Sequence, residues 1–194
     1  MERRQQQRQR RLSLTEVEAL ARDAHATQTD KAGRPYAEHL AAVAEGVRAR
    51  GGDDEQIAAA WLHDAIEDAA LTEQWLADAP LTARTKQIVL ALTKRPGENP
   101  RGYADRILAT PGATLVKTAD LAHNADPARL AALDEPTRDR LTRKYAEMRG
   151  LLGLEPGPGS GPGSGPGSGP GSGPGSGPGS GPGSGLGSGL GGDV

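Results

Sequence analysis

The chain has 194 residues and a formal net charge of −2, a balance that argues against a general nucleic-acid binder, whose domain is normally clearly basic. It contains no cysteine, so disulfides, zinc-thiolate sites and cysteine nucleophiles are excluded, and any metal must be held by His and carboxylates. No apolar run approaches the ~20 residues of a membrane span, and no apolar stretch of a secretory signal is present. We therefore expect a cytoplasmic protein that binds neither membrane nor nucleic acid.

Composition divides the chain into three predicted regions. Residues 1–12 are polar and basic, and we interpret them as a disordered terminus in preference to a nucleic-acid contact arm. Residues 153–194 are dominated by a Pro-Gly-Ser-Gly repeat without apolar surface to offset the entropy of ordering, which predicts a disordered tail. Residues 13–152 form one domain. Phenylalanine is absent and alanine is abundant, which predicts an all-α core in which small side chains let helices approach closely.

Apolar residues at helical spacing predict the elements in chain order. Ser13 or Thr15 caps the first helix, and Asp53 or Asp54 caps the third. The segment 29–36, TDKAGRPY, is a predicted loop, and no stretch shows the alternation of a strand. The predicted helices cover residues 13–25, 37–51, 53–70, 71–79, 81–95, 99–111, 112–126 and 134–152.

Ionisable residues interrupt the alanine-rich run AAAWLHDAIEDAA, residues 58–70, in the middle of the third predicted helix. Buried ionisable groups are costly unless they are paired, hydrogen-bonded or bound to a metal. Outside this run, His39 stands in PYAEH and Asp120 in VKTAD. Imidazole nitrogens and carboxylate oxygens together suit Mn²⁺, Fe²⁺, Zn²⁺ or Ni²⁺. Each residue taken singly is more often a satisfied core residue, and the dipeptide HD by itself carries little information.

The order H…HD…D resembles that of the HD-domain metal-dependent phosphohydrolases. The segments AHATQTDKAGRPYAEHLAAVA, AAAWLHDAIEDAALT and VKTADLAHNAD are similar to the hydrolase domain of the RelA/SpoT family, which removes pyrophosphate from (p)ppGpp. The resemblance runs from Leu14 to Tyr145, and LTKRPGENPRGY is most like the small stand-alone members. It implies an HD-domain helical bundle, and we expect no synthetase domain within this length.

The resemblance also implies the roles of individual residues. The implied metal ligands, with Mn²⁺ as the expected ion, are His39, His63, Asp64 and Asp120. Glu67 and Asp68 match the catalytic pair, whose carboxylates can orient a water activated by the metal or accept its proton. His25 also matches a family position, to which we assign only a supporting role. His123 can either contact a metal ligand or simply pack within its helix, and the sequence leaves both possibilities open.

Several residues are candidates for contacts with a nucleotide substrate. Lys117 and Asn124 lie one turn before and after Asp120 on one helix face. Lys31, Arg34 and Tyr36 precede His39 in the loop, although the two cations can equally be solvated and the tyrosine can simply pack.

Two positions depart from the family pattern. Asp30-Lys31 stands where the alarmone hydrolases have a basic pair, so an arginine available to stack on guanine is missing. Leu40 follows His39 where the family commonly has proline.

Three functions are compatible with these observations. The first is a metal-dependent phosphohydrolase acting on (p)ppGpp or a related phosphorylated nucleotide. The second is a catalytically silent HD module that binds a nucleotide or a partner protein, against which the intact Glu67-Asp68 pair counts. The third is a helical scaffold whose His and Asp residues are core pairs, and which would bind no metal tightly.

Overall fold

The structure is a computed structural model that describes residues 10–154. Within this range it is all-α, as predicted, with no strand and one isolated β-bridge between Thr29 and Pro35. Most of the two predicted disordered regions, 1–12 and 153–194, lies outside the described residues. The helices are α2 (Leu14–Ala24), α3 (Tyr36–Ala49), α4 (Asp54–Leu62), α5 (Glu73–Asp78), α6 (Ala83–Leu92), α7 (Pro100–Ala109), α8 (Ala113–Asn124), α9 (Pro127–Ala131) and α10 (Glu135–Leu151).

Side-chain caps fix where most of these helices begin. The Ser13 side chain accepts the backbone N–H of Glu16, whose carboxylate returns to the Ser13 N–H, which completes a capping box at the start of α2. Asp53 and Gln56 form the same reciprocal pair at α4. Ser13 and Asp53, rather than Thr15 and Asp54, are therefore the caps. The N-cap side chains of α5, α6, α7 and α10 are Thr72, Thr82, Asn99 and Asp134.

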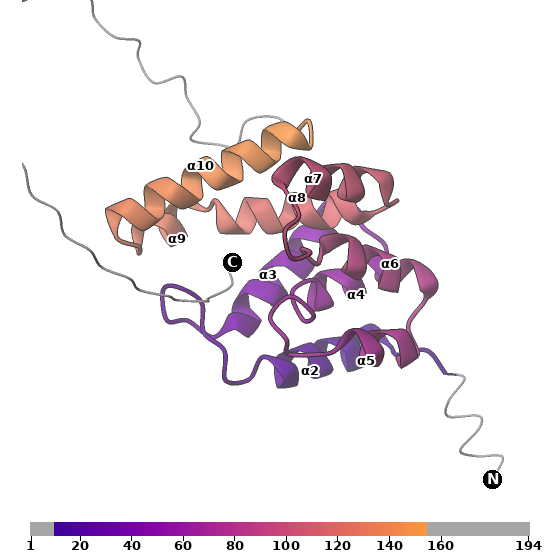
Figure 1. Ribbon diagram of the computed structural model, residues 1–194. Coiled ribbons are helices and arrows are strands. Elements are labelled where there is room, and N and C mark those ends of the chain that lie inside the picture. The colour runs from indigo at the N-terminus through magenta and orange to yellow at the C-terminus, as the bar shows by residue number, and fades with distance from the viewer. Residues whose placement is uncertain (1–9, 155–194) are drawn as a thin grey trace, which may run out of the picture.

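Helix α4 lies at the centre of the bundle, in contact with α2, α3, α6 and α8 (Figure 1). Its alanines, residues 58–60, are at most 6% exposed, so they permit the close approach of the helices around them. Helix α10 lies along the outside of α7 and α8 and buries Leu141 and Tyr145. No described helix combines the length and apolarity needed to cross a membrane.

Enlarging an alanine in α4 tests this packing. Ala59 is fully buried, so Ala59→Leu forces extra methyl groups into a filled core, and we expect the free energy of unfolding to fall by about 1–3 kcal/mol. Ala49→Leu, at an exposed position of α3, is the matched control and should change it by less than about 0.5 kcal/mol. Urea unfolding measures both variants, and equal losses would contradict a close-packed position for Ala59.

The prediction of one helix over 53–70 is wrong, because α4 ends at Leu62 and residues 63–69 form turns. Ala65 N–H bonds to Leu62 O and Asp68 N–H to Asp64 O, so only isolated helical bonds continue the chain. Ala69 has a φ of 56°, a left-handed conformation that ends any helix. The carboxylate of Glu67 is anchored in this segment by the backbone and side chain of Lys94. These long-range bonds outweigh the alanine-rich helical pattern.

Helix α9 was not predicted. The sequence indicated Pro127 only as the end of the preceding helix, but it is the first residue of a new one, where proline lacks no needed hydrogen bond. Asp126 caps α9 by accepting the N–H groups of Ala128 and Arg129. This short helix brings Arg129 beside the 29–36 loop.

Candidate metal centre and active site

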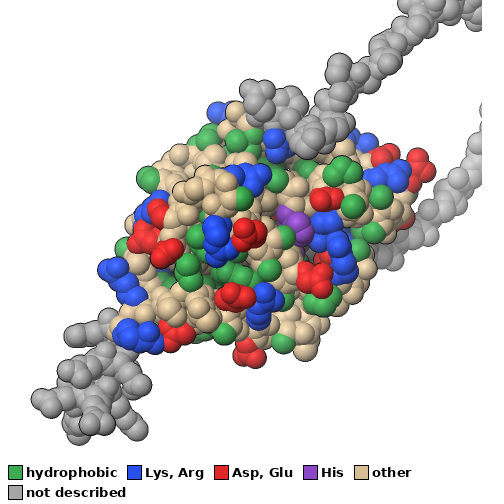
Figure 2. Space-filling model, turned by 180° about the vertical axis from the view of Figure 1, so that it is seen from behind, with side chains coloured by type: hydrophobic (Ala, Val, Ile, Leu, Met, Phe, Trp, Pro, Cys, Tyr) green, Lys and Arg blue, Asp and Glu red, His purple; other side chains and the backbone are tan. Residues whose placement is uncertain are grey.

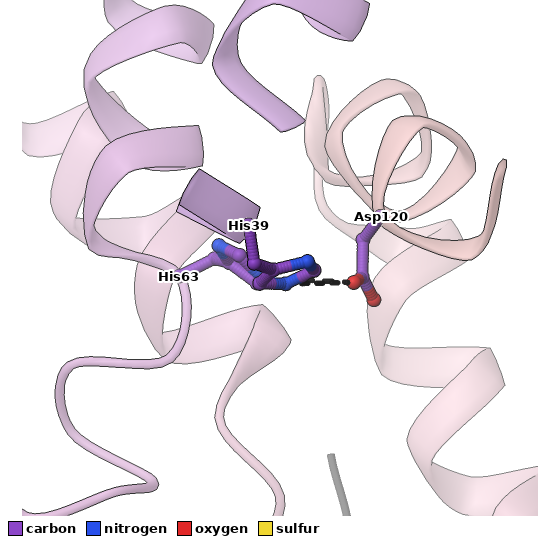
Figure 3. Close-up of side chains that lie close together, drawn as sticks. All are labelled: His39, His63 and Asp120. Atoms are coloured by element: carbon purple, nitrogen blue, oxygen red, sulfur yellow. Dashed lines mark ion pairs between the residues drawn. The ribbon is translucent and has the colours of Figure 1, made fainter. Parts of the chain in front are cut away.

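Three buried residues from three helical elements form a group able to hold a metal ion. His39 lies on α3, His63 at the end of α4, and Asp120 on α8, with ligand atoms all within 4.8 Å of one another. Figure 3 shows the two rings side by side, facing the Asp120 carboxylate. Asp120 Oδ1 is 3.4 Å from His39 Nε2 and 3.7 Å from His63 Nε2.

Asp64 joins the same group. Its Oδ2 lies 2.9 Å from His63 Nε2 and 3.5 Å from His39 Nε2. The same oxygen accepts a hydrogen bond of 2.6 Å from the Tyr36 hydroxyl. The structure therefore brings together the side chains predicted as ligands, although His63 and Asp64 sit in a turn and not in mid-helix.

The donor set fits a divalent cation. His39 Nε2 and His63 Nε2 are buried and make no hydrogen bond of proper geometry, whereas buried polar atoms are normally satisfied. His63 Nδ1 lies 2.7 Å from Ala60 O, so this nitrogen carries the proton and donates it. Nε2 is therefore the nitrogen that faces the carboxylates and can offer its lone pair to a metal once its proton leaves, as in metal sites whose second nitrogen is fixed by a carbonyl.

The electrostatics of this group agree with cation binding. Burial alone would raise the pKa of Asp64 and Asp120, but the neighbouring histidines, and Lys117 beside Asp120, hold both well below the usual value. Burial alone would lower the pKa of His63, but Asp64 and Asp120 raise it well above the usual value. Two ionised carboxylates thus attract positive charge to this point, and a metal that binds His63 displaces a proton.

A second layer of side chains orients the candidate ligands. Lys117 Nζ donates to Asp120 Oδ2 at 2.7 Å, and Asn124 Nδ2 donates to Asp120 Oδ1 at 2.6 Å. His39 Nδ1 lies 2.8 Å from His123 Nδ1, which places His123 in this layer. Burial and the neighbouring His39 lower the pKa of His123 to about 4, so His123 is neutral near pH 7. When His39 Nδ1 donates to it, His39 Nε2 keeps a lone pair for the metal.

The predicted catalytic pair is held by two residues that sequence reasoning did not assign. Glu67 bonds to Lys94 through the Lys94 backbone N–H at 3.0 Å and through Nζ at 3.1 Å. Asp68 accepts a hydrogen bond of 2.6 Å from Gln28, which in turn bonds to His25 at 2.5 Å. Burial, followed by the charges of Asp64 and Glu67, raises the pKa of Asp68. The partners belong to the quoted motifs AHATQ and LTK, but nothing local in those motifs shows what the side chains contact.

A cavity of about 340 Å³ opens beside this group. Glu67, Asp68 and Asn124 line it, as do Lys31, Arg34 and Arg129. Tyr36 lines it too, but its hydroxyl is engaged by Asp64. Histidine is visible near the middle of the face in Figure 2, with basic and acidic side chains around it.

A smaller cavity of about 50 Å³ adjoins the first and shares Glu67 and Asn124 with it. It is lined by two of the candidate metal ligands, Asp64 and Asp120, and by Lys94 and Lys117. Lys117 is predicted to bind substrate, and in the structure its ammonium group forms an ion pair with Asp120. Burial alone would lower the pKa of Lys117, but Asp120 raises it well above the usual value, so the ammonium stays charged.

Comparison with known proteins identifies the domain. Residues 18–95 match the model of an HD domain. The chain is 32% identical over 149 residues, 69% of its length, to a Synechocystis protein named probable guanosine-3′,5′-bis(diphosphate) 3′-pyrophosphohydrolase. It is 32% identical over 151 residues, 70% of its length, to the Haemophilus influenzae guanosine-3′,5′-bis(diphosphate) 3′-pyrophosphohydrolase. These alignments cover 19% and 22% of the two relatives, so the chain spans about a fifth of their length.

A solved structure supports the fold. It is described as a metazoan ortholog of SpoT that hydrolyses ppGpp, and it superposes with a TM-score of 0.58 at 20% sequence identity. The superposition covers 72% of this chain and 89% of that one. The predicted all-α bundle is therefore confirmed as a fold shared with that structure, and the HD match itself covers residues 18–95.

Proposed function

We propose that this chain, an HD-domain protein related to guanosine-3′,5′-bis(diphosphate) 3′-pyrophosphohydrolases, is a metal-dependent phosphohydrolase that removes pyrophosphate from (p)ppGpp or a related nucleotide. The observation that carries the proposal is the pair of buried, unbonded Nε2 atoms of His39 and His63, which face two carboxylates that line the small cavity. In a plain helical scaffold such atoms would be satisfied by hydrogen bonds.

The residues proposed to hold the metal are His39, His63, Asp64 and Asp120. A divalent cation there would supply Lewis acidity, polarising a phosphoryl oxygen and lowering the pKa of a bound water. Mn²⁺ is the proposed ion. Mg²⁺ and Ca²⁺ prefer ligand sets made only of oxygen atoms, whereas Mn²⁺ also accepts a mixed set of imidazole nitrogens and carboxylate oxygens. The hydrogen bonds from Tyr36, Lys117 and Asn124 to the two carboxylates keep their oxygens in place.

Asp68 is the proposed proton acceptor for the attacking water. The raised pKa of Asp68 lies closer to neutral pH, and a general base works best when its pKa is near the working pH. Gln28 fixes the orientation of Asp68 Oδ2. Glu67, held by Lys94, is proposed to help orient the water.

Positive charge is available for the departing oxygen atoms. In the overall reaction one water is consumed, the bond between the nucleotide 3′ oxygen and the pyrophosphoryl group is broken, and GDP and pyrophosphate leave. Lys94 and Lys117 line the small cavity beside the metal group, and their ammonium groups can stabilise charge that develops there.

Hydrolysis of ppGpp tests the proposal directly. We expect purified protein, dialysed and reloaded with Mn²⁺, to release pyrophosphate and GDP from ppGpp, with products resolved by anion-exchange chromatography, and to lose the activity in EDTA. A panel of other phosphorylated nucleotides is the control for substrate choice.

The alternatives have distinct outcomes in this assay. Metal-dependent turnover of another nucleotide alone would keep the phosphohydrolase and discard the alarmone. Bound metal without turnover of any substrate would favour the silent HD module. A cytoplasmic location and the absence of nucleic-acid binding stay predictions of the sequence.

A further inference from the structure

Asp30 has a defined structural role in the 29–36 loop. The Asp30 side chain is only 6% exposed, and its Oδ1 accepts the backbone N–H groups of Ala32 and Arg34, each at 2.9 Å. The Asp30 N–H also bonds to Arg34 O at 2.8 Å. Asp30 therefore closes the loop on itself and is held in one position.

The other oxygen of Asp30 collects arginines from two different elements. Oδ2 lies 3.0 Å from Nη1 of Arg129 on α9 and 3.6 Å from Nε of Arg34 in the loop. Arg129 is the more buried of the two, with its side chain 17% exposed against 46% for Arg34. The pKa of Asp30, which burial alone would raise, is lowered by the loop N–H groups and by these arginines. An ionised Asp30 thus fixes the Arg129 guanidinium at the cavity.

The cavity has two differently charged parts. Glu67 and Asp68 give a negative charge to the part of the cavity beside the candidate metal ligands. A bound metal ion and a proton on one carboxylate would offset this charge. Elsewhere in the lining, Arg34 and Arg129 share the single carboxylate of Asp30, which leaves a net positive charge among these three side chains. A ligand with a phosphorylated end at the metal-binding residues and a second anionic group is complementary in charge to both parts. The volume of about 340 Å³ suits a ligand of nucleotide class.

We propose that Arg129, oriented by Asp30, binds the phosphate groups on the non-reacting side of the substrate, which in a guanosine nucleotide is the 5′-diphosphate. The proposal rests on the proposed function and assigns Arg129 as a specificity residue of the same site. The ion pair with Asp30 uses Nη1, one of the three nitrogens that carry the five N–H donors of a guanidinium. A guanidinium held in this way is preorganised for bidentate contact with phosphate.

Binding of GDP and guanosine, measured by calorimetry without turnover, tests the proposal. Arg129→Gln should weaken GDP binding roughly ten- to a hundredfold, as expected for loss of a charge-assisted hydrogen bond, and leave guanosine binding unchanged. The KM for ppGpp should rise by a similar factor while kcat changes by less than about twofold, because uniform binding is lost. Arg101→Gln, at an exposed arginine of α7 paired with Asp105, is the matched control.

A second variant guards against a folding defect. Arg129→Gln leaves the buried carboxylate of Asp30 without its nearest cation, whereas Asp30→Asn/Arg129→Gln removes both charges and retains the side-chain oxygen that accepts the loop N–H groups. We expect the double variant to melt close to the wild type and to lose GDP binding as the single variant does.

Each outcome decides the proposal. Unchanged GDP binding in both variants, equal losses for GDP and guanosine, or a wild type that does not bind GDP would each overturn it. If the wild type binds GDP in an Arg129-dependent manner but releases no pyrophosphate from ppGpp, the proposed function fails and the phosphate contact stands. If the wild type hydrolyses ppGpp and Arg129→Gln matches it in KM and GDP binding, only the role of Arg129 fails.

Discussion

Asp64→Ala is expected to lose both bound metal and turnover. The substitution removes the oxygen that lies 2.9 Å and 3.5 Å from the two unbonded Nε2 atoms, and it also removes the acceptor of the Tyr36 hydroxyl. We expect metal affinity to fall by more than about 100-fold, because even residues that only orient a ligand contribute 10- to 100-fold. Metal content after dialysis, measured by mass spectrometry, and release of pyrophosphate report the two losses separately.

The control for Asp64→Ala is Asp105→Ala, which removes an exposed carboxylate of α7 that is 54% exposed and paired with Arg101. It should keep both metal and activity. Full metal retention by Asp64→Ala would remove Asp64 from the ligand set and leave the group of His39, His63 and Asp120 to hold the ion without it.

Glu67→Ala and Asp68→Asn are expected to keep the metal and lose most of the activity. Glu67 is bound by Lys94, and Asp68 is bound by Gln28. The group of His39, His63 and Asp120 forms without either carboxylate. Loss of a general base or of a group that orients water lowers kcat by about 10²–10⁴-fold. Metal content and single-turnover rates measured on the same preparations provide the test.

Gln28→Ala offers a graded comparison for the catalytic pair. It removes the hydrogen bond that orients Asp68 and leaves the carboxylate in place, so its effect on kcat should be smaller than that of Asp68→Asn. If Glu67→Ala loses as much metal as Asp64→Ala does, the division between ligands and catalytic carboxylates is wrong.

Local sequence signals predicted most of the helices, because the start and the apolar face of a helix depend on residues that are close together in the chain. The reciprocal bonds of Ser13 with Glu16 and of Asp53 with Gln56 join residues within one turn, so they can be recognised without knowledge of the fold. The spacing of apolar residues likewise predicted α8 and α10 with small errors at their ends. The sequence also supplied the types of ligand, since no cysteine is present and the histidines occur in motifs with acidic neighbours.

The interior of the site depended on contacts between distant parts of the chain. Helix α4 ends at Leu62 because Glu67 is bound by Lys94, and no pattern within residues 53–70 contains that information. The pairs His39 with His123 and Gln28 with Asp68 likewise join separate elements.

The sequence by itself determined the helical class and most helix starts, because these follow from backbone hydrogen bonding and side-chain chemistry within a few residues. The candidate metal ligands were implied by the resemblance of the histidine and aspartate motifs to a known family. Only the tertiary structure decided which side chains meet. Packing of α3, α4 and α8 brings the imidazole and carboxylate groups together, and the position of α9 brings Arg129 to Asp30. Such pairings are set by how helices pack in space, a property that no single segment encodes.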